Sequence, residues 1–566
     1  MSHALLKKLL GALPVAAALA CGPGQALAEP TVVAPVKGYT FAGDKLVPFE
    51  ALAFDKGRVL GVGEAASLAK QYPDARKIDG QGRTLLPGLI DAHGHVFRIG
   101  FRQSEVVVTD TRTLAEAQAR IKAYGQANPA RQWIMGSGWN QVIWKLDRFP
   151  TAAELDAAIP DRPVTLRRVD AHAIWANTKA LQMAGITRDT PDPVGGRIER
   201  DAKGEPTGIL IDKAQLLLTK VMPPYTDAER RLALDSAMRH FASLGLTGVG
   251  DAGTGADEVR IYREFADAGK LTSRVYAMIF DVGDDYKKLS AQGPLKGYGN
   301  ERFSLAAVKL FADGALGSRG AALLEPYSDD HNNKGLLFMD DAAMRAKVRT
   351  ALKAGYQVNV HAIGDAANRQ ILDAFEAAYK EDAGGMARRN RVEHAQVVSL
   401  QDIPRFKTLG LVASMQPTHA TSDMNMAEDR VGKERIKGAY AWQTFLKQGT
   451  VIAGGSDFPV ESANPFFGLH AAVTRTDHEG KPIAGWHPEE AMTLPQALRA
   501  FTLDAAYAQH QEKSIGSLEP GKWADFILVD QDPFTAAPGD IWKTKVLGTW
   551  LAGEQVYAAP SAPAAR

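Results

Sequence analysis

The sequence predicts an α/β protein: a (β/α)8 TIM barrel with a large insertion after its first strand, plus a small β-sandwich formed by the N- and C-terminal segments. Three observations favour this fold. Apolar strand patterns alternate with helical patterns through the middle of the 566-residue chain, eight strand candidates occur there, and both ends of the chain carry short alternating strands. Alternation of strand and helix is typical of parallel βαβ units, and eight such units close a barrel.

Residues 1–28 resemble a secretory signal peptide. Two lysines come first, an apolar stretch follows over residues 9–20, and Ala-Leu-Ala at residues 26–28 precedes Glu29. A membrane span needs about 20 apolar residues, and this stretch is shorter. We therefore expect export with cleavage after Ala28. No later apolar stretch is long enough to cross a membrane, so we expect no membrane span.

The only cysteine, Cys21, lies inside this segment. If cleavage follows Ala28, the mature protein has no cysteine, and neither a disulfide nor a reactive thiolate can form. The expected compartment is the periplasm of a Gram-negative bacterium. A lipoprotein anchored through Cys21 is the alternative, because residues 18–20 loosely resemble the sequence before a bacterial lipoprotein cysteine.

The composition is that of an ordinary globular protein. Lys and Arg (66) balance Asp and Glu (65), hydrophobic residues make up 45% of the chain and charged residues 23%. A nucleic-acid-binding domain carries a basic surplus, and a disordered chain holds fewer apolar residues. We therefore expect no nucleic-acid partner. A homodimer is one assembly that the sequence leaves open.

Residues 29–86 and 511–566 are expected to form one β-sandwich. Asp-Lys-Gly at residues 55–57 lies between apolar runs, which is typical of a hairpin turn. Alternating patterns recur at residues 523–530 and 546–553. Neither segment has enough strands to be stable alone, so we expect the two ends of the chain to pair.

The barrel is expected over residues 87–510. Its eight candidate strands are Leu85–Ile90, Gly245–Gly250, Arg274–Ile279, Ala306–Phe311, Tyr356–His361, Asn390–His394, Leu411–Met415 and Val451–Gly455. About 150 residues separate the first two strands, far more than a βα loop needs. We therefore expect an insertion at about residues 101–225 that forms a lobe over the barrel mouth.

Four histidines and one aspartate lie at the C-terminal ends of these strands. His93 and His95 are spaced by two on extended backbone and therefore point the same way. His361 ends the fifth strand, His394 ends the sixth, and Asp457 follows the eighth. Any one histidine is more often a core or surface residue than a ligand. Because the strand ends of a barrel converge, the five residues together predict a metal site.

Lys309 lies inside an apolar strand, Ala306–Phe311. An isolated ammonium group buried there would cost several kcal/mol. Either a nearby acid forms an ion pair with it, or CO2 converts it to a carbamate that can bind a metal through oxygen. The residues alone leave both interpretations open.

Five motifs carry a family resemblance. They are Leu86-Pro-Gly-Leu-Ile-Asp-Ala-His-Gly-His95, Val308-Lys-Leu-Phe-Ala-Asp-Gly314, Val360-His-Ala-Ile-Gly-Asp365, Arg391-Val-Glu-His-Ala-Gln396 and Gly455-Ser-Asp-Phe-Pro459. In this order they resemble the amidohydrolase superfamily, and more narrowly its amidohydrolase-3 branch, the YtcJ-like group that includes an N-substituted formamide deformylase.

The resemblance implies two divalent metal ions, with zinc as the expected metal, although iron and manganese tolerate the same ligands. It implies six metal-site residues: His93 and His95 on one ion, His361 and His394 on the other, Lys309 as a bridging CO2-derived carbamate, and Asp457 beside a bridging water.

The expected reaction is hydrolysis of a non-peptide C–N bond in an amide, N-substituted formamide, cyclic amide or urea. Two cations lower the pKa of a shared water, so that a bridging hydroxide exists at neutral pH, and Asp457 can act as general base and acid. The first alternative is a mononuclear deaminase or chlorohydrolase on the same fold, which has no role for Lys309 as a ligand. The second is an exported, non-catalytic metal- or solute-binding protein.

Three further residues are expected to contact the small-molecule substrate. Trp139 and His172 lie in stretches of the insertion that are similar to pocket segments of the branch, and Gln396 follows His394 by two residues. In the alternative interpretation, Trp139 belongs to the core of the lobe and His172 is a structural hydrogen-bonding residue.

Overall fold

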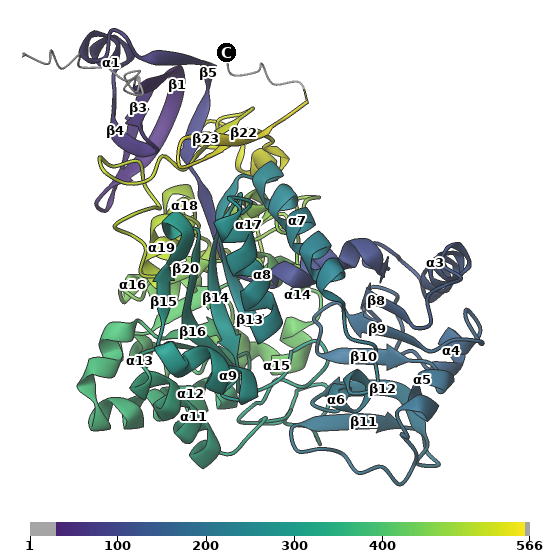
Figure 1. The fold of residues 1–566 in the computed structure, drawn as a ribbon. Coiled ribbons are helices and arrows are strands. Elements are labelled where there is room, and N and C mark those ends of the chain that lie inside the picture. The colour runs from purple at the N-terminus through teal and green to yellow at the C-terminus, as the bar shows by residue number, and fades with distance from the viewer. Residues whose placement is uncertain (1–29, 561–566) are drawn as a thin grey trace, which may run out of the picture.

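The computed structural model describes residues 30–560. The expected signal peptide, with Cys21, lies outside these residues. Hydrogen bonds between strands define three sheets in the described part: a barrel sheet, a lobe sheet and a terminal sheet (Figure 1). Within residues 30–560, none of the helices combines the length and the apolar character that crossing a membrane requires.

Eight parallel strands, each paired with the next in the chain, form the central barrel. They are β6 (Leu89–Gly94), β13 (Leu246–Thr254), β14 (Arg274–Phe280), β16 (Phe303–Phe311), β17 (Gln357–Ala362), β18 (Arg391–His394), β19 (Val412–Met415) and β20 (Ile452–Gly454). The short strand β15 (Leu295–Gly297) pairs antiparallel with β16. The mixed α/β class and the eight-stranded parallel barrel are confirmed.

Helices surround this barrel and follow most of its strands (Figure 1). They are α2 (Val96–Phe101), α7 (Asp227–Ser243), α8 (Ala256–Asp267), α9 (Asp284–Leu289), α10 (Tyr298–Glu301), α11 (Asp341–Lys353), α12 (Asp365–Glu381), α13 (Ile403–Thr408), α14 (Pro417–Asp423), α15 (Ala427–Arg435), α16 (Trp442–Lys447), α17 (Pro465–Thr474), α18 (Leu494–Ala500) and α19 (Leu503–Ala508). Short 3-10 turns are Arg102–Ser104, Ser290–Gln292, Ala383–Arg388, Ile436–Gly438 and Pro488–Glu490. At the start of α7, Thr226 and Glu229 form a capping box that satisfies free amides.

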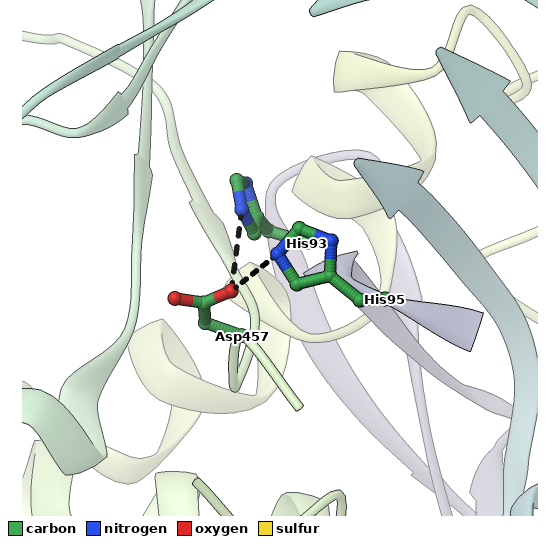
Figure 2. Close-up of side chains that lie close together, drawn as sticks. All are labelled: His93, His95 and Asp457. Atoms are coloured by element: carbon green, nitrogen blue, oxygen red, sulfur yellow. Dashed lines mark ion pairs between the residues drawn. The ribbon is translucent and has the colours of Figure 1, made fainter. Parts of the chain in front are cut away.

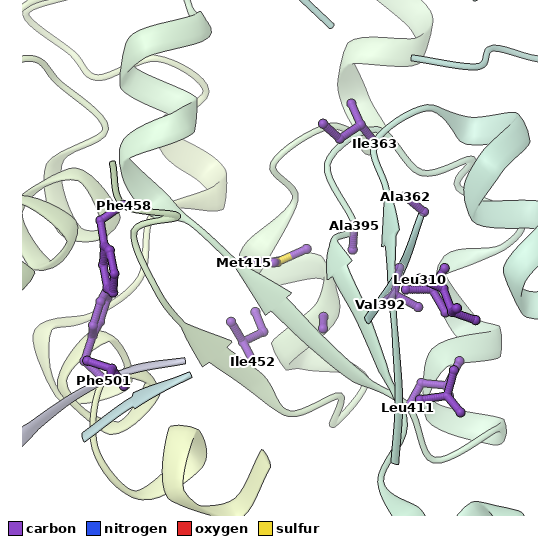
Figure 3. Packing of buried hydrophobic residues seen from close by; sticks show 14 of the residues in the cluster. Leu310, Ala362, Ile363, Val392, Ala395, Leu411, Met415, Ile452, Phe458 and Phe501 are labelled. Carbon is purple, nitrogen blue, oxygen red and sulfur yellow. The ribbon is translucent and has the colours of Figure 1, made fainter. Parts of the chain in front are cut away.

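Apolar side chains on the outer face of the barrel strands pack against these helices. Leu310, Val392 and Ile452 belong to this layer (Figure 3), and each is almost fully buried. Phe375 of α12 and Phe406 of α13 are buried in the same cluster. Because the core lies between strands and helices, the inner strand ends are left to carry polar groups.

Polar contacts close the barrel between its last and first strands. The backbone N–H of Asp457 donates to the carbonyl of His93 over 2.7 Å, and that of His95 donates to the carbonyl of Phe458 over 2.7 Å. The hydroxyl of Ser456 donates to the buried carboxylate of Asp91 over 2.6 Å. These contacts hold the segment after β20 against the end of β6.

The insertion forms its own six-stranded sheet beside the barrel (Figure 1). In the order β11-β12-β10-β9-β8-β7 its strands are Gly196–Arg200, Pro206–Asp212, Ala173–Ala176, Val164–Arg168, Ile134–Trp139 and Val106–Val107. Its helices are α3 (Leu114–Ala127), α4 (Ala152–Asp156), α5 (Thr178–Met183) and α6 (Gln215–Thr219). We call this unit the lobe.

The two ends of the chain pair as expected. The strands are β1 (Thr31–Ala42), β2 (Lys45–Phe49), β3 (Ala51–Asp55), β4 (Arg58–Gly63), β5 (Arg76–Pro87), β21 (Phe526–Val529), β22 (Val546–Leu551) and β23 (Glu554–Ala558), with α1 (Ala65–Gln71) and a 3-10 turn at Pro538–Lys543. Antiparallel pairing of β5 with β21 joins the ends, so that one continuous sheet of eight strands surrounds a shared core. At the expected hairpin, Lys56 and Gly57 have φ of +48° and +76°, as a tight two-residue turn requires.

One predicted strand is divided in the structure. Leu85 and Leu86 belong to β5 and pair with β21, and the first barrel strand begins only at Leu89. The apolar run is continuous in the sequence because both strands are buried. The break falls at Gly88, where a Cβ atom would lie 2.1 Å from Oγ1 of Thr247.

A buried ion pair ties the barrel to the terminal sheet. The guanidinium of Arg274, at the start of β14, donates to both carboxylate oxygens of Asp525 over 2.7 and 3.0 Å. Asp525 also accepts a hydrogen bond from the backbone N–H of Ala552 over 2.7 Å. Both side chains are almost completely buried. If one partner were lost, water could therefore not solvate the charge that remained.

Replacing Arg274 with methionine would leave the carboxylate of Asp525 buried without its partner. Removing one member of a buried pair costs about 3–5 kcal/mol, so we expect Arg274→Met to unfold at a lower urea concentration than the wild type. Arg231→Met is the matched control, because Arg231 pairs with Glu264 on the exposed faces of α7 and α8. Equal unfolding midpoints for the two variants would contradict this interpretation.

Candidate metal centre

The barrel brings together the histidines that lie at its strand ends. His93 lies on β6, His361 on β17 and His394 at the end of β18. The ring centroids of His93 and His394 are 4.9 Å apart, and those of His361 and His394 are 4.6 Å apart. His95 follows β6 at the start of α2, and its ring centroid lies 5.8 Å from that of His93.

Asp457 lies against the first two histidines. Its Oδ1 is 3.1 Å from Nε2 of His95 and 3.5 Å from Nε2 of His93 (Figure 2). The residue has a φ of +58°, and the barrel seam fixes its backbone. Although burial alone would raise the pKa of Asp457, the neighbouring imidazoles of His95, His93 and His394 hold it well below its usual range.

The far nitrogen of each of three imidazoles has a partner. Nδ1 of His93 contacts the carboxylate of Glu393, and Nδ1 of His394 donates to the side-chain oxygen of Gln416 over 2.8 Å. Nε2 of His361 lies 3.3 Å from the carbonyl oxygen of Gly314. A proton on the partnered nitrogen leaves the other nitrogen of each ring with a free lone pair, which is the arrangement of metal-binding histidines.

Glu393 is itself held by an arginine. Nε of Arg391 lies 2.7 Å from Oε1 of Glu393, and the same guanidinium donates to the carbonyl of Ala92 over 2.8 Å and to Oγ of Ser414 over 2.9 Å. Although burial would raise the pKa of Glu393, the charge of Arg391 and the contact with His93 lower it. Glu393 therefore stays ionised and orients His93.

The three inner histidines are neutral at neutral pH. Burial lowers the pKa of His93 to about 4, with the ammonium of Lys309 acting in the same direction. Burial also holds the pKa of His361 and of His394 well below the usual value. Neutral imidazole is the form that binds a metal ion, so no proton has to leave these rings first.

Lys309 lies among these rings. The side chain is 1% exposed, and its Nζ lies 3.3 Å from Nε2 of His93 and 4.5 Å from the ring centroid of Phe311. Within residues 30–560, no carboxylate forms a salt bridge with it. Burial lowers the pKa of Lys309 to about 8. The ion pair, which is one of the two interpretations of Lys309, is therefore not formed in the described part of the chain.

The donor set fits divalent cations. Two groups of three side chains each have ligand atoms within 4.8 Å of one another: His93, His95 and Asp457, and His394, His419 and Asp457. Oδ1 of Asp457 and Nε2 of His419 are buried and have no hydrogen-bond partner in the part of the chain that the structure describes. Mixed nitrogen and oxygen donors suit zinc, iron or manganese. Buried oxygen and nitrogen atoms without a hydrogen-bond partner are expected where a metal ion binds to them.

Sequence reasoning missed Glu393 and His419. Glu393 stands beside His394 in its motif, but its contact with His93 joins residues 300 positions apart. His419 follows β19 after Gln416, and β19 is one of three barrel strands, with β13 and β14, whose ends carry no residue of the predicted site. Its position at a strand end is the signal that could have identified it.

A cavity of about 570 Å³ opens onto this cluster. Barrel residues line one end and lobe residues, among them Arg168 and His172, line the other. Nδ1 of His172 lies 2.7 Å from Oδ1 of Asp212, and its ring centroid lies 5.0 Å from that of His361. Although burial acts in the opposite direction, the carboxylate of Asp212 raises the pKa of His172.

Trp139 lies away from the cavity, in the core of the lobe. It is fully buried, and its indole N–H donates to the carbonyl of Leu166 over 2.9 Å. The pairing of β8 with β9 shifts register between Ser137 and Trp139, and Gly138 has a φ of +98°. This irregularity turns Ser137 and Gly138 to the cavity and the indole into the core, in agreement with the alternative interpretation of Trp139.

Gln396 also lies outside the cavity wall. Its side-chain amide donates to Asp423 over 2.9 Å and to the hydroxyl of Tyr440 over 2.7 Å. The expectation that it shares the face of His394 assumed extended backbone. His394 and Ala395 instead have φ of +74° and +42°, so the two-residue alternation does not continue past the strand end.

Comparisons with known proteins agree with this geometry. A family model described as the amidohydrolase family matches residues 76–557. The YtcJ protein of Bacillus subtilis is 34% identical over 519 residues, covering 90% of this chain and 96% of that protein. An N-substituted formamide deformylase of Arthrobacter pascens is 30% identical over 523 residues, covering 90% of this chain and 95% of that protein.

A solved structure shows the same fold. The crystal structure of an uncharacterized metal-dependent hydrolase from Pyrococcus horikoshii matches with a TM-score of 0.72 at 28% identity, covering 90% of this chain and 99% of that one. The resemblance found in the sequence motifs is therefore confirmed. This chain belongs to the amidohydrolase family and is a hydrolytic enzyme of that family.

Proposed function

We propose that this enzyme hydrolyses a non-peptide C–N bond in an amide, N-substituted formamide, cyclic amide or urea, with two divalent metal ions, zinc being the expected metal. The observation that carries this proposal is Lys309, a buried amine without a carboxylate partner in the described chain, with its Nζ 3.3 Å from Nε2 of His93 in the candidate metal centre. The type of bond is supported by the Arthrobacter pascens relative, whose name is that of an N-substituted formamide deformylase.

The environment of Lys309 favours a carbamate. The neutral amine adds to the carbon of CO2 and one proton is released, which leaves an anionic group with two oxygen donors on the side chain. That anion stands next to neutral His93, His361 and His394 and close to cations, where it costs far less than an unpaired buried ammonium group. Lys309 in this form would bridge the two metal positions.

The chain supplies ligands for both positions. His93 and His95 would hold one ion, His361 and His394 the other, with Asp457 beside both. Two divalent cations would lower the pKa of the attacking water and polarise the substrate carbonyl.

The protein's own groups move the protons. The carboxylate of Asp457 accepts a proton from the attacking water and delivers it to the leaving nitrogen. The C–N bond then breaks, which gives an amine and a carboxylic acid, or an amine and a carbamic acid when the substrate is a urea. Because Asp212 holds Nδ1 of His172, Nε2 of His172 is left free for a hydrogen bond to substrate.

The metal content of protein produced from Glu29 onward, with bicarbonate supplied during expression, tests the two-metal assignment. We expect about two ions per chain by elemental mass spectrometry, as a bridged dinuclear site requires. About one ion per chain would favour the mononuclear deaminase or chlorohydrolase instead. No ion after reconstitution would contradict metal catalysis. A fully metallated protein without turnover of formamides, N-acyl amino acids, hydantoins and lactams would favour a binding protein.

Lys309→Ala removes the proposed bridge. We expect this variant to lose metal and to hydrolyse substrate at least about a hundredfold more slowly, since even residues outside the ligand set change activity 10–100-fold. Added acetate or propionate can supply the missing carboxylate, and it should restore part of the metal content and part of the hydrolytic activity. Lys287→Ala, at an exposed lysine, is the control. Unchanged metal content and activity in a folded Lys309→Ala would show that the lysine is not a ligand.

Glu393→Gln tests the residue that orients His93. The amide keeps the size of the side chain but removes its charge, so we expect metal affinity to fall by about 10–100-fold without loss of fold. Competition with a chelator measures the affinity. Glu264→Gln, on the surface, should match the wild type. Wild-type affinity in Glu393→Gln would mean that the carboxylate does not act on the metal centre.

A further inference from the structure

Arginines line the cavity wall next to the metal centre without carboxylate partners. Arg98, Arg102 and Arg167 all face the cavity of about 570 Å³ and the adjoining cavity of about 500 Å³. Within residues 30–560, none of the three forms a salt bridge. Arginines are usually buried or half-buried only with a paired acid, so this wall is unusual in its chemistry.

Two structural units deliver these arginines to one place. His95 is the N-cap of helix α2, Arg98 follows by three residues, and Arg102 begins the 3-10 turn after the helix, four residues further on. Spacings of three and four residues place the three side chains along one side of this segment. Three residues, about 4.5 Å of rise in an α-helix, separate His95 from Arg98. Arg167 comes from β9 of the lobe and lines the same two cavities as His95.

The guanidinium groups differ in how many donors are already used. Arg102 donates to the carbonyl of Pro459 and to Oγ1 of Thr109, each over 2.7 Å. Arg167 has a single side-chain hydrogen bond, to Gln215 over 3.0 Å. Arg98 makes no side-chain hydrogen bond with any described residue. Arg98 and Arg167 therefore hold most of the free donors.

Of the four acids that line the main cavity, Asp457 belongs to the candidate metal centre and the other three are paired with other side chains. Asp170 is paired with Arg168, Asp281 with Lys347 and Asp212 with His172. Glu105, in the adjoining cavity, accepts a hydrogen bond from the hydroxyl of Tyr225. Glu105 keeps its negative charge in this contact, and that charge acts on Arg102 and Arg167. Because one such carboxylate faces three arginines, a surplus of positive charge remains at this wall.

The two free guanidinium groups repel each other. Burial, together with the charge of Arg98, lowers the pKa of Arg167 to about 9. Like charges held together in a cavity are stabilised by an anion between them, and Arg presents paired donors that match a carboxylate or phosphate. The same wall carries an uncovered aromatic ring, because Phe280 lines both cavities with 54% of its surface exposed.

We propose that the substrate carries an anionic group, a carboxylate or a phosphonate, which Arg98 and Arg167 bind together, and an apolar group that covers Phe280. This inference rests on the proposed hydrolase function and names its substrate class. Because only three residues separate His95 from Arg98 and both line the same cavity, a molecule the size of an N-acyl amino acid reaches the metal centre and the arginines at once. The cavity of about 570 Å³ is of ordinary size for such a ligand.

Matched pairs of ligands test the anionic group. The probes are N-formyl derivatives of alanine, leucine and phenylalanine in both chiralities, their decarboxylated amine counterparts, and the corresponding aminophosphonates. Binding to metal-depleted protein is measured by calorimetry, and turnover by metal-loaded protein is measured separately. We expect at least one acid to bind at least about tenfold more tightly than its neutral counterpart, a difference of about 1.4 kcal/mol. The carboxylate and phosphonate arms show which anion the site prefers.

Arginine variants test which residues cause the preference for anionic probes. In Arg98→Met/Arg167→Met the preference for the anion should disappear while the neutral probes bind as before. Arg231→Met, on the outer face of α7, should keep the wild-type preference. If the acids bind no better than their neutral counterparts, or if no probe binds, the anionic substrate is ruled out. A preference that persists in the double variant also overturns the assignment.

The two readouts separate this inference from the proposed function. If the acidic probes bind more tightly but none is hydrolysed, the arginine site is supported and hydrolysis of these substrates is contradicted. If neutral and acidic probes are hydrolysed at equal kcat/KM, the hydrolase function is supported and the anionic substrate group is contradicted.

Discussion

The seam between the last and first barrel strands is the constraint on which the site depends. No ladder of hydrogen bonds joins β20 to β6, and the contact rests instead on Ser456 with Asp91 and on two backbone hydrogen bonds around Asp457. The same contacts set the distance from Asp457 to His95. An open seam would separate the carboxylate from the first pair of histidines, and the donor set would no longer fit one cluster.

The barrel and the lobe contribute different residues to the cavity. The barrel strand ends supply the candidate metal ligands, and three of their imidazoles are held by a second contact, such as that of His93 with Glu393. The lobe supplies Arg167, Arg168 and His172 to the opposite wall of the cavity. We therefore expect the chemistry to depend on the barrel strand ends. Substrate choice should depend on both units, because Arg98 of α2 and Phe280 of β14 lie on the barrel side of the cavity and Arg167 lies on β9 of the lobe.

Much of this arrangement could be predicted from the sequence because it follows from regular backbone. The barrel strands are apolar runs bounded by polar residues, and a histidine at a strand end must lie at the barrel mouth. His93, His361 and His394 were identified in this way without any contact being known. Lys309 stood out for a related reason, since a charged side chain in a buried strand requires an explanation.

The remaining features depend on irregular backbone or on long-range contacts. Trp139 turns into the lobe core at a register shift, and Gln396 leaves the expected face because two preceding residues have positive φ. Neither irregularity has a marker in a single sequence other than Gly138. The role of Glu393 arises only when β18 and β6 lie across the barrel from each other, which no local pattern encodes.

Anomalous diffraction from crystals of the metal-loaded protein distinguishes a dinuclear from a mononuclear centre, because it locates each metal ion independently of activity. We expect two peaks, one within about 2.0–2.1 Å of nitrogens of His93 and His95 and one equally close to His361 and His394, with density for a carboxylate extending from Lys309 between them. A single peak, or an unmodified Lys309 beside two ions, would contradict the bridged dinuclear centre.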